Sequence, residues 1–195
     1  MNNIYGNFRE IETEKSTEYL QLSFSPSSLS LKERWGNNGL SADFLGDYFR
    51  TFLPKTLGDN ENYSRRDEIK STVSYIANEL LENAIKFNND NIDYSISIRL
   101  NLDVDKITLW LTNNVTQSLY EAYQNFVEEL LNNDPQELYF ERLEQNAEKE
   151  FADSSGLGLL TILVDYKAKL AWKFQSIKNN GEENFVVVTM VELEI

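Results

Sequence analysis

Residues 64–88 carry the pattern that most restricts how this chain can fold. Apolar side chains recur there at positions i, i+4, i+7 and i+8, namely Ile69, Val73, Ile76, Ala77, Leu80, Leu81, Ala84 and Ile85. This spacing predicts a long amphipathic helix with a wide buried face. A helix with such a face packs against a second layer of structure, so the other segments have to supply that layer.

Strand patterns occur on both sides of this helix. Leu20, Leu22 and Phe24 alternate with polar residues, and alternation returns in 94–102, 107–111, 170–174 and 185–191. A period of two residues is typical of half-buried strands. Further helical patterns occupy 29–35, 41–52, 116–150 and 159–167.

The order of these segments predicts an α+β fold. Strands come mostly as antiparallel neighbours and helices gather between them, which favours a two-layer α/β sandwich with a mixed, mostly antiparallel sheet and helices on one face. Residues 1–17 are polar and patternless, so we expect a loosely ordered N-terminal segment. Residues 18–195 are expected to form a single domain.

The composition excludes several kinds of chemistry. The 195 residues include no Cys and no His, which removes disulfides, thiolate nucleophiles, Cys-based zinc sites and Ser-His-Asp triads. The 18 basic and 32 acidic residues give a net charge of −14. A protein that binds nucleic acids or anionic membranes needs a basic surface. We therefore expect a cytoplasmic protein that binds neither nucleic acid nor membranes. Any catalysis has to use carboxylates, amides, hydroxyls, Lys, backbone groups or a hard cation such as Mg²⁺.

Three polar residues of the long helix share one narrow stripe. Glu79, Asn83 and Lys86 stand at i, i+4 and i+7, and about 100° of rotation per residue brings them to one side of the helix, beside its apolar face. A carboxylate, an amide oxygen and an ammonium group there suit a site for phosphate and Mg²⁺. An ordinary solvated helix edge has the same spacing, because i,i+4 pairs are common on surface helices.

A glycine-containing turn opens the helix expected at 159–167. Gly156, Leu157 and Gly158 stand at this turn, where glycines let the backbone approach a ligand and the free N–H groups of a helix start favour an anion. A plain loop before a helix has the same composition. The turn lacks the preceding strand and the third glycine of a dinucleotide-binding fingerprint.

Taken in this order, the motifs resemble those of the Bergerat-fold ATPases, the group of gyrase, heat-shock protein 90, histidine kinases and MutL. Residues 78–86 look like the N-box of that group, residues 156–162 resemble its second glycine box, and residues 169–193 are similar to the closing hairpin of histidine-kinase ATPase domains. The run Phe-Ser-Pro-Ser at 24–27, followed by Leu31 and Arg34, is similar to the start of the anti-sigma-factor serine kinases. More narrowly, the chain looks like cyanobacterial and other bacterial ATP-binding, kinase-like proteins of partner-switching signalling.

The resemblance implies a role for each of these residues, with ATP and Mg²⁺ as the cofactors. Glu79 matches the general base, Asn83 matches the Mg²⁺ ligand, and Lys86 matches the N-box cation near the phosphates. Gly156, Leu157 and Gly158 match the phosphate loop. Residues 114–155 match the lid that closes over ATP.

One box of the family is altered in this chain. The Bergerat-fold ATPases read adenine with the Asp of an Asp-x-Gly-x-Gly box. In this chain Asn113 stands in the place of the Asp, and Val115 and Gln117 replace the two glycines. An Asn accepts a hydrogen bond from the adenine amino group without charge. Asn184 or Glu183 falls where the family usually has a Thr that supports adenine.

The resemblance leaves competing functions. The first is a serine/threonine kinase of a small regulatory protein, antagonist-type or sigma-factor-like. The second is a nucleotide-free, non-catalytic binding module of the same fold. The third is the ATPase domain of a larger machine such as gyrase or MutL, which needs transducer domains for which the chain has no room. The absence of His excludes a histidine autokinase, and a homodimer is expected only from the anti-sigma relatives.

Overall fold

Six strands form one sheet in which every pairing of neighbours is antiparallel. The computed structural model describes residues 2–11, 18–25, 38–52, 60–89, 92, 94–147, 156–179 and 182–195. In spatial order the strands are β1 (Asn2–Tyr5), β5 (Lys169–Asn179), β6 (Glu182–Glu194), β4 (Lys106–Val115), β3 (Ile96–Leu102) and β2 (Glu18–Phe24). The strands named by the period-two pattern are thus confirmed, and the sheet is wholly antiparallel in its described pairs rather than mixed.

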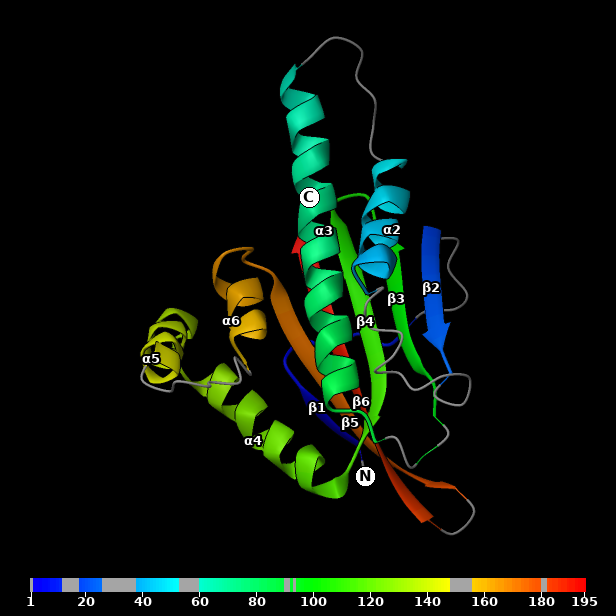
Figure 1. The fold of residues 1–195 in the computed structure, drawn as a ribbon, viewed down its shortest axis with the longest axis vertical. Coiled ribbons are helices and arrows are strands. Elements are labelled where there is room, and N and C mark those ends of the chain that lie inside the picture. Colours follow the sequence, from blue (N-terminus) through cyan, green and yellow to red (C-terminus); the bar gives the residue numbers. More distant parts are fainter. Residues whose placement is uncertain are drawn as a thin grey trace.

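Five helices lie within the described residues, and they pack on one face of the sheet (Figure 1). They are α2 (Asn38–Arg50), α3 (Asn60–Lys86), α4 (Gln117–Asn132), α5 (Pro135–Ala147) and α6 (Leu157–Val164). The long helix is confirmed as α3 and runs along the middle of the sheet, with α2 at its side. The α+β fold with helices on one face is therefore confirmed.

The core lies between α3 and the central strands. Val73, Ile76 and Leu80 of α3 are at most 1% exposed, and they pack in one cluster with the inward-facing Ile98 and Leu109. The i, i+4 and i+7 spacing on the helix and the period of two on the strands bring these residues to a common interface. Each fully buried side chain of this size contributes roughly 1.5–3 kcal/mol by leaving water.

Part of the N-terminal segment that the sequence predicts to be loosely ordered is held at the sheet. Residues 2–5 form β1, which pairs with β5 at the edge of the sheet. Gly6, at a φ of 69°, turns the chain there, and a Cβ on it would lie 2.8 Å from the carbonyl oxygen of Leu170. A short polar edge strand shows no apolar period, which is why the pattern missed it. Residues 12–17 lie outside the described part of the chain.

The segment after β1 covers the face of the sheet that the helices leave open. Phe8 and Ile11 pack against a small cluster that contains Trp110 and Met190. The indole Nε1 of Trp110 donates to the carbonyl oxygen of Arg9 at 2.9 Å, and the Arg9 guanidinium donates to Thr108 at 2.8 Å. These contacts explain why Trp110 is only 5% exposed although it faces away from the helices.

The remaining elements occupy the end of the sheet where β4 finishes. Helix α4 begins directly after β4, α5 follows it, and α6 lies beside α3 (Figure 1). Helices α4 and α5 fall in the region expected to form a lid, while residues 148–155 of that region lie outside the described part. The helix expected near 29–35 is also outside it. In the part of the chain that the structure describes, no helix is both long and apolar enough to cross a membrane.

Candidate functional site

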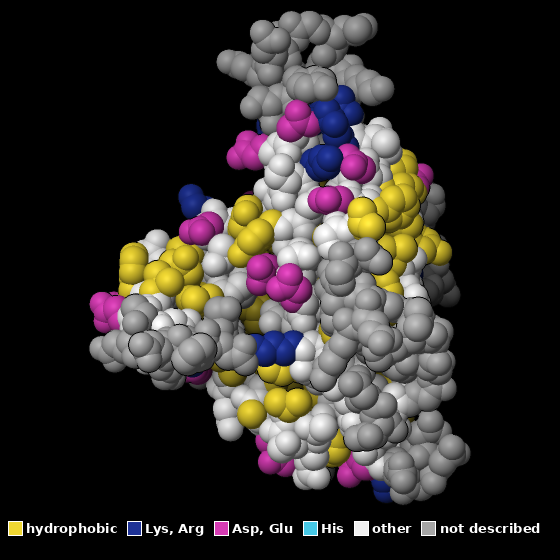
Figure 2. Space-filling view, in the orientation of Figure 1, with side chains coloured by type: hydrophobic (Ala, Val, Ile, Leu, Met, Phe, Trp, Pro, Cys, Tyr) yellow, Lys and Arg dark blue, Asp and Glu magenta, His cyan; other side chains and the backbone are white. Residues whose placement is uncertain are grey.

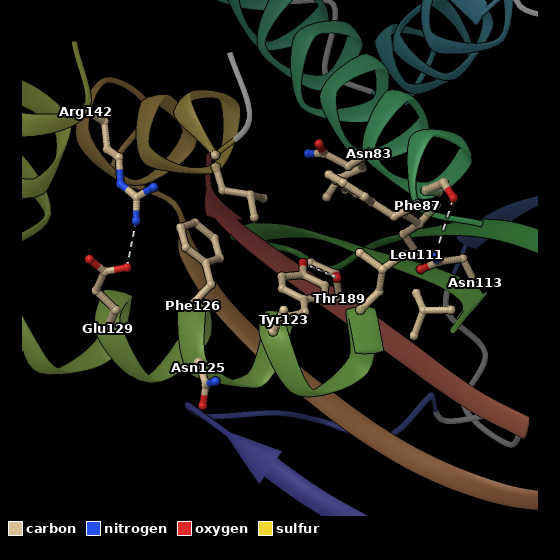
Figure 3. Close-up of a pocket in the computed structure, with 17 residues that line it drawn as sticks. Asn83, Phe87, Leu111, Asn113, Tyr123, Asn125, Phe126, Glu129, Arg142 and Thr189 are labelled. Carbon is tan, nitrogen blue, oxygen red and sulfur yellow. Dashed lines mark hydrogen bonds and ion pairs between the residues drawn. The ribbon is translucent and has the colours of Figure 1, made fainter. Parts of the chain in front are cut away.

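A cavity of about 590 Å³ opens between α3, α4, α6 and the sheet. Its volume lies within the usual range of small-molecule sites, roughly 300–1,000 Å³. Its walls are largely apolar, and a few polar side chains converge on it (Figure 3). The described residues that line it are Leu80, Asn83, Ala84, Phe87, Leu111, Asn113, Val115, Leu119, Ala122, Tyr123, Asn125, Phe126, Glu129, Arg142, Gly156, Leu159 and Thr189.

The polar stripe of α3 divides between three surroundings. Asn83 lines the cavity, while Glu79, one turn earlier, lies against the start of α6. Lys86 is exposed and does not line the cavity. Its ammonium nitrogen lies 5.5 Å from the centre of the Phe87 ring. The structure thus brings Asn83 to the cavity and leaves Lys86 outside it.

Glu79 and Gly158 touch one another across two helices. A Cβ built on Gly158 would overlap the Oε2 atom of Glu79, so a side chain at this position would displace the carboxylate from where it lies. Burial raises the pKa of Glu79, the nearby charge of Glu82 raises it further, and a hydrogen bond with Tyr75 opposes both effects. Glu79 is not among the described residues that line the cavity, but it lies one helical turn from Asn83, which does line it. A carboxyl group with a raised pKa suits proton transfer.

The glycine turn lies at the other side of the same cavity. Gly156 is the N-cap of α6 and has a φ of 96°, in the left-handed region that side chains other than glycine rarely adopt. A Cβ on Gly156 would lie 3.3 Å from the ring of Phe126. Leu157 is the first residue of α6, and its carbonyl oxygen accepts from the Thr161 hydroxyl at 3.0 Å. The turn lets the backbone at the start of α6 border the cavity.

Asn113 lines the cavity from β4 and is only 5% exposed. Its amide nitrogen Nδ2 lies 3.4 Å from the carbonyl oxygen of Ala84 and 3.3 Å from that of Asn114, and it donates to both. With both amide hydrogens used in this way, the oxygen Oδ1 is the atom that can accept from a ligand. The orientation of the amide is therefore set by the protein backbone.

Thr189 lines the cavity, whereas the resemblance pointed to positions 183 and 184 for the residue that supports adenine. The register of β4 and β6 pairs Thr189 with Leu111, two residues from Asn113, whereas Asn184 pairs with Ile177 of β5. The sequence feature that could have indicated Thr189 is that it is a hydroxyl residue at an inward-facing position of the apolar run at 185–191. Pairing register depends on contacts between distant strands, so spacing along the chain did not give the position.

Helix α4 contributes an aromatic part of the cavity wall that no motif indicated. The hydroxyl of Tyr123 lies 3.2 Å from the Thr189 hydroxyl. The indole Nε1 of Trp172 donates to the Tyr123 hydroxyl at 3.0 Å. Burial raises the pKa of Tyr123, so the phenol stays neutral. This chain of hydrogen bonds ties α4 to the sheet beneath the cavity.

The altered adenine box has a structural counterpart. Val115 ends β4, is 2% exposed and lines the cavity. Thr116 caps α4, its hydroxyl accepting from the backbone N–H of Leu119 at 3.4 Å, and Gln117 is the first residue of the helix. The chain therefore passes from strand to helix at the positions where the family has a glycine-rich loop.

Changing Asn113 to Asp is expected to destabilise this protein instead of restoring the family's box. A carboxylate at this position would face the carbonyl oxygens of Ala84 and Asn114 with no hydrogen to donate, and leaving buried polar groups unpaired costs about 1–3 kcal/mol. Burial among acceptors raises the pKa of the introduced carboxyl in the folded protein. Near pH 4, about the pKa of Asp in the unfolded chain, the loss in the free energy of unfolding is therefore small, and it grows as pH rises. Urea denaturation at about pH 4 and about pH 8 measures it. The exposed change Asn132→Asp is the control, and equal stability of Asn113→Asp and wild type at the higher pH would contradict the expectation.

Comparisons with known proteins support the fold. No family model matches the sequence, and no curated protein matches it. The structure is similar to a chain in the crystal structure of the SiaB–SiaC complex from Pseudomonas aeruginosa, with a TM-score of 0.53 and 15% sequence identity. The match covers 89% of this chain and 89% of that chain. At this level of identity the likeness shows that the two chains share a fold over most of their lengths.

Proposed function

We propose that this chain is an ATP-binding regulatory protein of the cytoplasm, a serine/threonine kinase that acts on a small antagonist-type partner in partner switching. The observation that carries the proposal is a cavity of about 590 Å³ bordered by both motif-bearing elements, Asn83 on α3 and Gly156 at the start of α6. Elements more than 70 residues apart in the sequence thus border one ligand-sized space.

The end of the cavity around Asn113, which has no charged side chain among its described lining residues, suits adenine. The oxygen of Asn113 accepts from the exocyclic amino group of the base, since its own N–H groups are held by backbone carbonyls. Leu111 and Ala84 supply apolar walls on which a flat base packs, and Thr189 adds a hydroxyl beside them. An uncharged acceptor and apolar walls favour a purine over a charged headgroup in this half of the cavity.

Mg²⁺ would arrive with the nucleotide. In the described residues, no group of three or more acidic side chains could hold a metal ion by itself. Mg²⁺ usually takes one or two protein ligands together with phosphate oxygens, and the amide oxygen of Asn83 is suited to be one of them. The ion would neutralise charge on the phosphates, while the carboxylate of Glu79 would accept the proton of the attacking hydroxyl.

A protein partner is favoured by two observations. Hydrophobic side chains gather on the surface over α2 and α5 (Figure 2). They include Leu40, Phe44 and Phe140, which are 68%, 51% and 63% exposed, and exposed apolar patches are typical of protein-interaction surfaces. The similar chain comes from a crystal structure of a complex of two proteins, SiaB and SiaC. A small regulatory protein and a second copy of this chain are the partners that we propose for these surfaces.

Calorimetric titration with Mg-ATP tests the binding step. Wild type is expected to bind, and Asn83→Ala is expected to bind at least about tenfold more weakly, because it loses a metal ligand worth more than about 1.4 kcal/mol. The exposed change Asn132→Ala removes an amide outside the cavity and is the matched control. Absence of binding by wild type at millimolar nucleotide would contradict the proposal.

A nucleotide-free binding module is the second candidate, and the junction of β4 with α4 favours it. Val115 projects into the cavity and Gln117 already belongs to α4, so the glycine freedom with which relatives accommodate the nucleotide is missing. Partner capture followed by incubation with Mg-ATP tests this candidate. Strong ATP-dependent phosphorylation of the captured partner would contradict it.

A further inference from the structure

We propose that Arg142 is the phosphate-binding residue of the cavity and that Glu129 competes with the ligand for it. This inference rests on the proposed function and deepens it, because it assigns the charged end of the nucleotide to a residue outside every motif of the sequence. Arg142 thus takes the role of the cation near the phosphates, which the resemblance gives to Lys86.

Arg142 is the only cationic residue lining the cavity among those that the structure describes. It projects from α5 and forms an ion pair with Glu129 of α4, with 2.7 Å between Nη2 and Oε2. Lys86 does not line the cavity. A nucleotide with several negative charges enters a protein whose own charge is −14, so a cation at the site has a large effect on its affinity.

The position of Arg142 agrees with that of the glycine turn. Its guanidinium carbon lies 5.7 Å from the centre of the Phe126 ring, and the same ring lies 3.3 Å from where a Cβ on Gly156 would be. Phe126 therefore links the cation to the turn that borders the cavity. Two elements that suit an anion, a guanidinium and the start of a helix, meet on one ring.

The cavity is consequently polarised along its length. Figure 3 shows Asn113 near one end and Arg142 with Glu129 near the other, with Tyr123 and Phe126 between them. The first end offers an uncharged amide oxygen, the middle offers aromatic rings, and the last offers a guanidinium. A nucleotide has the same order of groups, from base through sugar to phosphates.

Glu129 governs how much of the Arg142 charge a ligand meets. One N–H of the guanidinium faces the Glu129 carboxylate, and the side chain is 30% exposed, so its fork can still turn to a second acceptor. A phosphate that binds Arg142 has to share it with the carboxylate or displace it. Removing the negative charge of Glu129 therefore favours the phosphate, whereas removing Arg142 leaves Glu129 to repel it.

Titration with ATP and with adenosine, against wild type and two variants, tests the assignment. Arg142→Gln is expected to weaken ATP binding by about tenfold or more, as the loss of a charge-assisted hydrogen bond does, and to leave adenosine binding unchanged. Glu129→Gln is expected to tighten ATP binding several-fold, again without an effect on adenosine. Arg65→Gln is the matched control, since this exposed residue lies roughly 22 Å along α3 from the cavity.

The outcomes separate the inference from the proposed function. Binding of neither ATP nor adenosine by wild type overturns both. Binding of both by wild type, with Arg142→Gln weakening the two equally or neither, overturns the inference alone and assigns the ion pair to joining α4 and α5. Weaker ATP binding by Glu129→Gln also overturns it, and this variant keeps the test decisive if Arg142→Gln does not fold.

Discussion

Replacing Glu79 with Gln is expected to slow phosphoryl transfer from Mg-ATP by about 10²–10⁴-fold, the usual contribution of a general base. The carboxylate is held against the start of α6 because Gly158 carries no side chain there, and Gln preserves its size while removing its ability to accept a proton. Phosphate release from Mg-ATP, with water as the acceptor, measures the loss in purified protein. ATP binding is expected to change little, which separates this variant from Asn83→Ala.

The pH dependence of the same reaction identifies the base. Burial raises the pKa of Glu79, and the charge of Glu82 adds to the effect. A base acts in its ionised form, so the wild-type rate falls as pH falls through this raised pKa. Glu82→Gln removes the neighbouring charge and is expected to move the acid limb to lower pH. An acid limb that persists unchanged in Glu79→Gln would assign it to another group.

The part of this site that the sequence predicts is the part carried by a single element. Glu79 and Asn83 lie one turn apart, and helical geometry fixes their relation before any tertiary contact forms. The contact between Glu79 and Gly158 is different, since it joins residues of two helices far apart in the sequence. Their glycine and carboxylate are visible in the sequence, but the packing that brings them into contact is not.

The positions of the residues that the sequence motifs missed or misplaced are set by contacts between helices and strands. Arg142 lies on an acidic helix, and it lines the cavity because α5 packs against α6 at the far end of α4 (Figure 1). Lys86 shares the stripe of Asn83 on the helix, yet the stripe fixes only its Cβ, and the long side chain places the ammonium over Phe87. Helical position predicts the direction of short side chains better than that of long ones.

Replacing Trp172 with Ala is expected to lower the free energy of unfolding by about 3–5 kcal/mol, the usual cost of removing a large buried aromatic side chain. Trp172 is fully buried on β5, and its indole donates to the hydroxyl of Tyr123, which in turn meets Thr189. The change leaves a void beneath α4 and takes a donor from a buried phenol. Urea denaturation measures the loss.

Two further variants separate packing from hydrogen bonding at Trp172. Trp172→Phe keeps most of the apolar volume and removes the donor, so it is expected to cost about 1–3 kcal/mol. Phe140→Ala removes an aromatic side chain that is 63% exposed and is expected to stay within about 0.5 kcal/mol of wild type. Because Tyr123 lines the cavity and Trp172 holds its hydroxyl, adenosine binding should weaken in Trp172→Ala and persist in Phe140→Ala. A Trp172→Ala protein as stable as wild type would mean that α4 is held by other contacts and that the hydrogen bond from Trp172 to Tyr123 does not support the cavity wall.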